Sequence, residues 1–237
     1  MQEERRVVND SGMTRFFNKV YSTMGLGLLL TAVISYLLGT VFLPQYVGFI
    51  SAHPIMFYVL LFLPILLSFG VSSRRAQANA AYASLMFYLI SASYGVTFTV
   101  ILMSYRQSIV AISFLTTAVI FLTMSIVGRT TQKDLSRAGS MAFTALIGVI
   151  ILSLVNMFMH STGLMYLISY AILIIFIVMT AFDTQKLKQI YLTADSRGGY
   201  TVNTNSLAVQ GALALYLDFL NIFLVLLQLF GGSSNRN

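Results

Sequence analysis

Two acidic residues in the last third of the chain have the type and the setting to handle protons or cations. Asp218 is the single carboxylate in the apolar run ALYLDFLNIFLVLLQLF, residues 214–230, and Asp183 lies in TAFDTQKLKQIY, residues 180–191. An ionised carboxylate near the middle of a bilayer costs about 2.5 to 3.5 kcal/mol, so Asp218 must be paired, hydrated or protonated. Two carboxyl groups that meet in a medium of low dielectric constant cannot both ionise freely, and they titrate as a coupled pair. Contact between Asp183 and Asp218 would therefore create a pH-sensitive group.

Structural interpretations of both acids stay open at this point. As a neutral acid, Asp218 can join two helices through hydrogen bonds, or it can be half of a buried ion pair. Asp183 precedes Lys186 and is equally typical of a solvated residue at the end of a helix. The natural cationic partners for Asp183 are Arg74 and Arg75, at the inner end of the second apolar segment. A pair of arginines in a short inner loop is just as typical of a topology determinant.

Depth in the membrane decides whether the two acids can meet. If the helix of Asp183 ended at Phe182 and the last helix began at Leu207, Asp218 would lie about 16 Å deeper, at 1.5 Å per residue. Lysines reach the interface through long side chains, so the helix of Asp183 can continue to about Tyr191. The carboxyl groups are then able to meet.

The polar residues around each acid follow helical spacing. Thr180 shares a face with Asp183, and a stripe of small and polar residues shares a face with Asp218. Small and polar stripes allow helices to approach closely and to hydrogen-bond inside a membrane bundle. We therefore expect Asp218 to face protein or a water-filled cavity. The stripe around Asp218 consists of Gly211, Ala214, Asn221, Val225 and Gln228, with Leu213, Leu220, Phe223 and Leu227 opposite.

The composition is that of an integral membrane protein. Of the 237 residues, 57% are hydrophobic and 9% are charged, and the mean hydropathy is +0.83, which leaves too little polar surface for a soluble domain. The absence of cysteine excludes disulfide frameworks, iron–sulfur clusters and cysteine nucleophiles. The histidines His53 and His160 fall at segment boundaries, and nothing near them completes a metal site. We expect no cofactor.

The predicted fold is all-α, with seven transmembrane helices in one domain of residues 21–230. An amino-terminal tail of residues 1–20 precedes it, and a short outer tail of residues 231–237 follows. A membrane span needs about 20 apolar residues, which seven segments provide. They are Tyr21–Leu43, Pro54–Ser72, Ala80–Met103, Ser108–Val127, Ser140–Phe158, Gly163–Phe182 and Leu207–Phe230.

The basic residues predict the orientation. With the amino terminus in the cytoplasm and the carboxyl terminus outside, 12 of the 14 Lys and Arg residues fall on the inner side, and the exceptions are Arg106 and Arg236. Such a bias in short loops is what sets topology. The net charge of +7 therefore belongs to residues that orient the chain in the lipid bilayer, which is the expected partner. No nucleic-acid partner is expected.

Two acids inside a membrane bundle are also found in one class of enzyme. Intramembrane aspartyl proteases use paired carboxylates to activate water. They carry a Gly-x-Gly-Asp run, whereas Leu215, Tyr216 and Leu217 precede Asp218 here. We therefore expect that the chain is not an enzyme.

These residues, in this order, resemble the Bax inhibitor-1 family, also called the transmembrane Bax inhibitor motif family. The resemblance covers nearly the whole chain. For a bacterial member of the family it implies a location in the inner membrane. It is carried by Tyr94, Gly95 and Thr97, by KDLSRAG at 133–139, by AFDTQKLK at 181–188 and by ALYLDFLNIFLVLLQLFG at 214–231.

The resemblance implies a seven-helix fold with a central last helix that the other six surround. Its members are described as proton-sensitive calcium leak channels. By motif, the pH sensor and weak, transient Ca2+ ligands would be Asp183 and Asp218, with Ca2+ and protons as partners. The latch would be Arg74, with Arg75 the weaker match.

Departures and a second function also follow from the resemblance. Phe182 stands where relatives commonly have Tyr, the segment 188–205 is long, and 54–72 lacks the acid that some relatives carry. Some bacterial relatives are substrates and modulators of a membrane-anchored AAA-type protease, and eukaryotic relatives suppress cell death. The alternative function is therefore a membrane regulator that does not transport ions. It would bind and modulate such a protease, or stress or cell-death machinery, through its amino-terminal tail.

Overall fold

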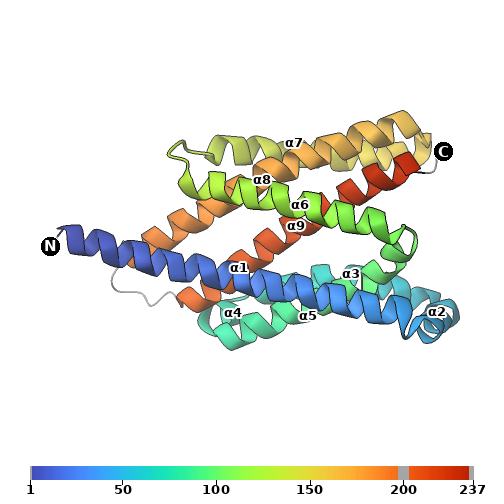
Figure 1. Ribbon diagram of the computed structural model, residues 1–237, viewed down its shortest axis with the longest axis horizontal. Coiled ribbons are helices and arrows are strands. Elements are labelled where there is room, and N and C mark those ends of the chain that lie inside the picture. Colours follow the sequence, from blue (N-terminus) through green and yellow to red (C-terminus); the bar gives the residue numbers. More distant parts are fainter. Residues whose placement is uncertain (1, 197–202, 235–237) are drawn as a thin grey trace. The chain divides into compact units, whose positions relative to one another are not determined.

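The computed structural model describes residues 2–196 and 203–234, and the side chains of 11–193 and 203–232. Within these ranges the chain forms nine helices and no strand (Figure 1). The helices are α1 Gln2–Thr40, α2 Leu43–Ala52, α3 Pro54–Val71, α4 Arg74–Ala78, α5 Ala80–Met103, α6 Gln107–Thr130, α7 Ser136–Met159, α8 Thr162–Ser196 and α9 Thr204–Ser234.

Seven of these helices are long and apolar enough to cross a membrane, which confirms the predicted all-α, multi-pass fold. Each predicted segment falls on one of them. The sixth span is longer than predicted and reaches Thr193, because the helix continues past its lysines. α1 begins at Gln2, so the predicted tail of residues 1–20 is helical where it is described. The sides of the membrane on which the two tails lie stay predictions, and residues 197–202 and 235–237 are outside the described part.

Two short helices between spans were not predicted. A window long enough to detect a membrane span averages over them. α2 has Pro44 in its first turn, where a missing backbone N–H costs nothing. The Tyr46 hydroxyl ties α2 to α5 by donating to the Val96 carbonyl at 2.8 Å. α4 is capped by Ser73, whose Oγ accepts from the backbone N–H of Ala76.

The described chain divides into two compact units. The first comprises Met1–Ser104 and Tyr191–Tyr216, and the second comprises Tyr105–Ile190 and Leu217–Asn237. In the first unit, α5 packs against both α1 and α3. Gly27 and Gly95 make the approach of α1 and α5 close, since a Cβ on Gly27 would overlap the Phe87 ring. This is the packing role expected of small residues in membrane helices.

Burial differs sharply among the spans. In the most apolar 18-residue window of each span, 67% of α9 is buried, against 11% of α3 and of α7. Since Asp218 is 4% exposed, the expectation that it faces protein is confirmed. The leucines opposite it, Leu213 and Leu220, are buried too, so α9 is enclosed on more than one face. That the other six helices surround it stays a prediction.

Candidate functional site

The segment Ala181–Lys188 of α8 carries Asp183 and is held by its neighbours in the second unit. Gly128 of α6 faces the backbone of Ala181, and a Cβ at this glycine would overlap the Ala181 carbonyl oxygen. Gly139 of α7 faces the ring of Phe182 in the same way. Gly128 therefore allows α8 into backbone contact with α6, and Gly139 leaves room for the Phe182 ring against α7. The Phe182 ring therefore has a packing role against α7.

Gln185 clamps the loop between α6 and α7. Its side chain is 6% exposed. The Gln185 Nε2 donates to the Lys133 carbonyl at 2.8 Å, and the Leu135 N–H donates to Gln185 Oε1 at 2.8 Å. One buried amide thus satisfies a carbonyl and an N–H that lie two residues apart in this loop. Lys188 adds a hydrogen bond of 2.8 Å from Nζ to the Arg129 carbonyl, at the end of α6.

Asp183 and Asp218 both belong to the second unit, and they interact electrostatically. Asp183 is partly exposed, whereas Asp218 is 4% exposed. The charge of Lys186, one turn further along α8, also acts on Asp183. No protein group within the described residues donates a hydrogen bond to the Oδ2 atom of Asp218. Asp218 is therefore a buried carboxyl with an unsatisfied oxygen and a second acid in electrostatic range.

The polar residues predicted to support the acids are occupied elsewhere. Thr180 donates to the Phe176 carbonyl at 2.7 Å, and Asn221 donates to the Leu217 carbonyl at 2.8 Å. Each of these bonds returns to the residue's own helix, four positions earlier. Gln228 is partly exposed, like Asn221. The stripe therefore leaves Oδ2 of Asp218 open.

A buried hydroxyl network in the first unit was missed by the sequence reasoning. The Tyr216 hydroxyl lies 2.7 Å from Thr31 Oγ1, which is also 2.9 Å from the Ser91 carbonyl and 3.0 Å from the Gly27 carbonyl. Thr31 and Tyr216 each have one hydroxyl proton, and either hydroxyl can be the donor of the bond between them. This bond fixes α9 to α1 and α5. Tyr216 within the LYLDF run was the available signal.

The two candidate latch residues have different surroundings. Both are exposed on α4. The Arg75 guanidinium lies over the Tyr82 ring at 5.2 Å from its centroid, a cation–π contact. Arg74 has no ion pair or hydrogen bond within the part of the chain that the structure describes. Because the latch residues and Asp183 belong to different units, their pairing stays a prediction.

The described residues contain no group of three or more His, Cys, Asp or Glu that could hold a metal ion. His53 and His160 are exposed at helix ends. His160 ends α7 with a left-handed φ of 49°. Two carboxyl groups supply only part of the six to eight oxygens that Ca2+ prefers, so the acids can be stations for a cation only with other oxygen ligands.

Seven apolar helices, one of which buries the Asp218 carboxyl, define a multi-pass membrane protein. The family described as inhibitor of apoptosis-promoting Bax1 matches residues 13–235, and the chain belongs to this Bax inhibitor-1 family. The inner membrane protein YbhL of Escherichia coli K12 is 36% identical over 221 residues, which are 93% of each chain. An uncharacterized membrane protein of Streptococcus pyogenes serotype M1 is 36% identical over 223 residues, which are 94% of this chain and 95% of that protein.

Proposed function

We propose that this chain is a pH-sensitive calcium leak channel, with Asp183 and Asp218 as its proton sensor. The observation that carries the proposal is the Oδ2 atom of Asp218, which is buried in a membrane span without a hydrogen-bond donor. Acids inside membrane spans are rare and typically mark ion or proton pathways. A proton or a passing cation would supply the missing partner. The proposed place is a bacterial inner membrane, with the amino terminus in the cytoplasm.

Calcium would be bound weakly during passage. The carboxyl oxygens of Asp183 and Asp218 can provide some of the ligands, and waters and carbonyl groups would provide the rest. Conduction requires binding that is strong enough for entry and weak enough for exit. A two-acid site with no third acidic ligand among the described residues fits a leak better than storage.

Protonation would open the gate. In the proposed closed state, ionised Asp183 pairs with Arg74, and a proton on the acid pair ends this attraction. Lys186 competes for Asp183 within its own unit. Because the closed state needs an ionised carboxyl, flux should rise as the pH falls.

The test is Ca2+ flux into proteoliposomes across a pH series. We expect Asp183→Asn and Asp218→Asn to flatten the pH dependence, because an amide does not titrate in this range. Asp134→Asn is the matched control, since it removes an exposed acid outside the site and should leave the pH profile unchanged. A wild-type pH profile in both site variants would refute the sensor, and a flux-free wild type would refute the channel.

A second pair of variants tests whether Arg74 is the latch. Arg74→Gln should raise flux at neutral pH, because the ionised Asp183 then loses its partner. Arg75→Gln should change flux less, since this guanidinium already contacts Tyr82. Equal effects of the two variants would argue against a specific latch.

A further inference from the structure

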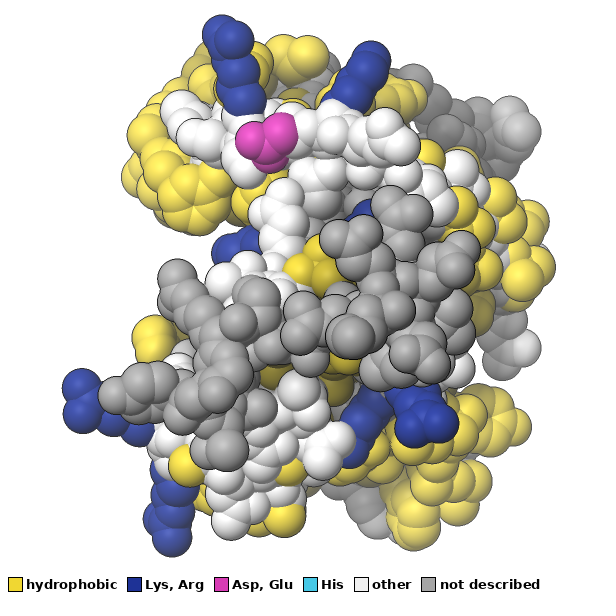
Figure 2. All heavy atoms as spheres, turned by 90° about the vertical axis from the view of Figure 1, so that its left-hand side faces the viewer, with side chains coloured by type: hydrophobic (Ala, Val, Ile, Leu, Met, Phe, Trp, Pro, Cys, Tyr) yellow, Lys and Arg dark blue, Asp and Glu magenta, His cyan; other side chains and the backbone are white. Residues whose placement is uncertain are grey.

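One end of the second unit is rich in cations. The end of α6, the loop after it, the start of α7 and the nearby part of α8 carry five Lys and Arg residues, whereas Asp134 is the one fully exposed acid among the described residues of this unit. Figure 2 shows a face of the molecule on which Lys and Arg predominate among the charged side chains. The five cations are Arg129, Lys133, Arg137, Lys186 and Lys188.

Two of these cations are available to a ligand. Lys133 and Arg137 are exposed and form no ion pair within the described residues. By contrast, the Lys186 ammonium lies 5.7 Å from the centroid of the Phe182 ring, and Lys188 is bonded to a backbone carbonyl. No ion pair with a described residue therefore neutralises the charge on Lys133 or Arg137.

The loop that presents Lys133 and Arg137 is braced. Gln185 holds it at the Lys133 carbonyl and at the Leu135 N–H. Asp134 accepts from the Ser136 N–H at 2.9 Å, which satisfies a backbone donor at the start of α7. Hydrogen bonds from Ser136 hold the pKa of Asp134 below its usual range, so this acid stays ionised as part of the turn. The buried Gln185 side chain of α8 thus fixes the short surface loop that carries Lys133 and leads to Arg137 at the start of α7.

Apolar side chains for a membrane follow directly on the same helix. Met141, one turn beyond Arg137, is 66% exposed, and Phe143, two residues further along α7, is 57% exposed. α7 is among the least buried spans, so its outward face is available to acyl chains. A ligand that fits both features has an anionic head and a hydrocarbon tail. A free phosphate ion would use only the first feature.

We propose that the segment 131–137, with Lys133 and Arg137 as its contacts, binds the headgroup of an anionic phospholipid whose acyl chains lie against α7. Basic residues next to a span attract anionic lipid by about 1 kcal/mol each, or roughly fivefold in affinity. The bracing by Gln185 reduces the ordering cost of binding, because the loop is already fixed. This site is independent of the proposed ion flux.

The test is lipid retention by the purified full chain in neutral detergent, measured by native mass spectrometry. Phosphatidylglycerol and phosphatidylcholine with identical acyl chains are the probes. We expect retention of phosphatidylglycerol over phosphatidylcholine, a loss of roughly fivefold in each of Lys133→Gln and Arg137→Gln, and roughly 25-fold in the double variant. Asp134→Asn should raise retention, because it removes the exposed acid.

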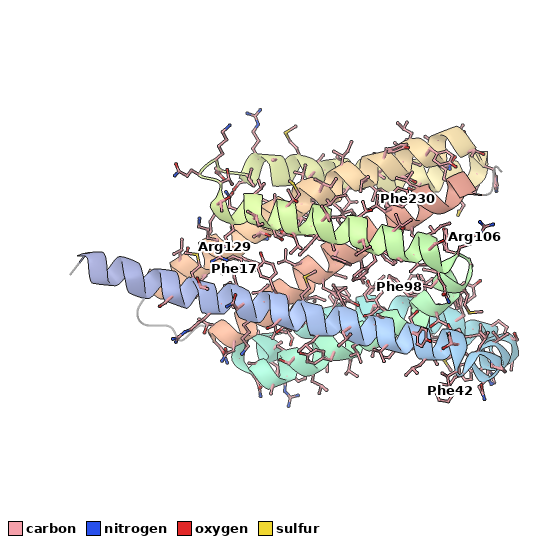
Figure 3. The ribbon with its side chains drawn as sticks, viewed as in Figure 1. Phe17, Phe42, Phe98, Arg106, Arg129 and Phe230 are labelled. Carbon is pink, nitrogen blue, oxygen red and sulfur yellow. The ribbon has the colours of Figure 1, made fainter. Side chains whose placement is uncertain are left out.

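Arg106→Gln is the matched control, since Arg106 is an exposed cation at the other end of α6 from Arg129 (Figure 3). It should keep wild-type retention, and the thermal unfolding of each variant shows that it is folded. Three results would overturn the proposal: wild-type retention by a folded double variant, an equal loss in Arg106→Gln, or equal binding of phosphatidylcholine. Displacement by soluble glycerol phosphate at lipid-matched concentration would reassign the site to free phosphate, against the lipid.

Discussion

The substitution Gln185→Ala tests whether one buried amide holds the loop between α6 and α7. The variant removes both hydrogen bonds of the Gln185 side chain, one to the Lys133 carbonyl and one from the Leu135 N–H, each 2.8 Å long. The helices on either side keep their own backbone bonds. The expected change is a local opening of the loop, with α6 and α7 intact.

The magnitude follows from these two bonds. A typical hydrogen bond contributes about 0.5 to 1.5 kcal/mol net, so the pair contributes about 1 to 3 kcal/mol to the closed loop. The freed groups lie next to water and can be solvated after opening, which favours the lower half of this range. A change of about 1.4 kcal/mol corresponds to a tenfold change in an opening equilibrium, so the Leu135 amide should lose about tenfold in protection.

The assay is hydrogen–deuterium exchange with residue-level resolution on the protein in detergent. Thr131 N–H, which donates to Val127 in α6, should keep its protection and serves as the internal reference. Gln132→Ala is the matched variant, because Gln132 is an exposed glutamine of the same loop. Gln185→Glu should retain most of the protection of Leu135, since it keeps an acceptor for that N–H. Unchanged exchange at Leu135 in Gln185→Ala would refute the clamp.

Three further predictions concern stability and are read from thermal unfolding. Gly128→Leu should destabilise by about 1 to 3 kcal/mol, because its side chain would enter backbone-to-backbone contact with α8, whereas Gly148→Ala, with nothing within 4 Å of the new Cβ, should not destabilise. Tyr216→Phe should cost about 0.5 to 1.5 kcal/mol by removing its buried hydrogen bond to Thr31, while Tyr170→Phe, at an exposed position, should be neutral. Asp134→Ala should lower stability above about pH 5, and the difference should shrink below about pH 4, because a carboxyl whose pKa is lowered by folding loses its contribution as the pH falls through that pKa.

Hydropathy and charge were enough to predict the seven spans, because a span must be apolar over about 20 residues and this average survives without any knowledge of packing. The helical spacing of small and polar residues predicted that Asp218 faces protein or a cavity. The hydropathy average ended the sixth span at Phe182, because lysines lower it, whereas the extension to about Tyr191 that long lysine side chains allow agrees with a span that reaches Thr193. The short helices α2 and α4 were missed because they do not cross the membrane.

The contacts that position the site were outside the reach of the sequence. The side-chain types of Gln185 and Thr184 carry no information on their partners, Leu135 and Ser125, which lie 50 and 59 residues away in the chain. In the sequence, Gly128 and Gly139 do not differ from other small residues, because their role comes from the packing of α8 against them. Thr180 and Asn221 show the reverse error, since their helical phase was right and yet their hydrogen bonds return to their own backbone. Periodicity gives the face of a residue, whereas its partner depends on the packed neighbours.

Two buried polar groups on α9 differ in whether they have a hydrogen-bond partner. This difference suggests a test between the structural and the functional interpretation of Asp218. The Tyr216 hydroxyl is fully buried and bonded to Thr31, whereas the Asp218 Oδ2 is buried without a donor. If Asp218 joined helices as a structural acid, Asp218→Leu would destabilise by about 1 to 3 kcal/mol. If it is kept for proton or cation exchange, the apolar side chain of similar size should leave stability unchanged or raise it, because functional sites commonly carry groups that cost stability. Thermal unfolding of Asp218→Leu, with Asp218→Asn as the polar isostere, measures the sign of this change. A clear loss of stability in both variants would return Asp218 to a structural role.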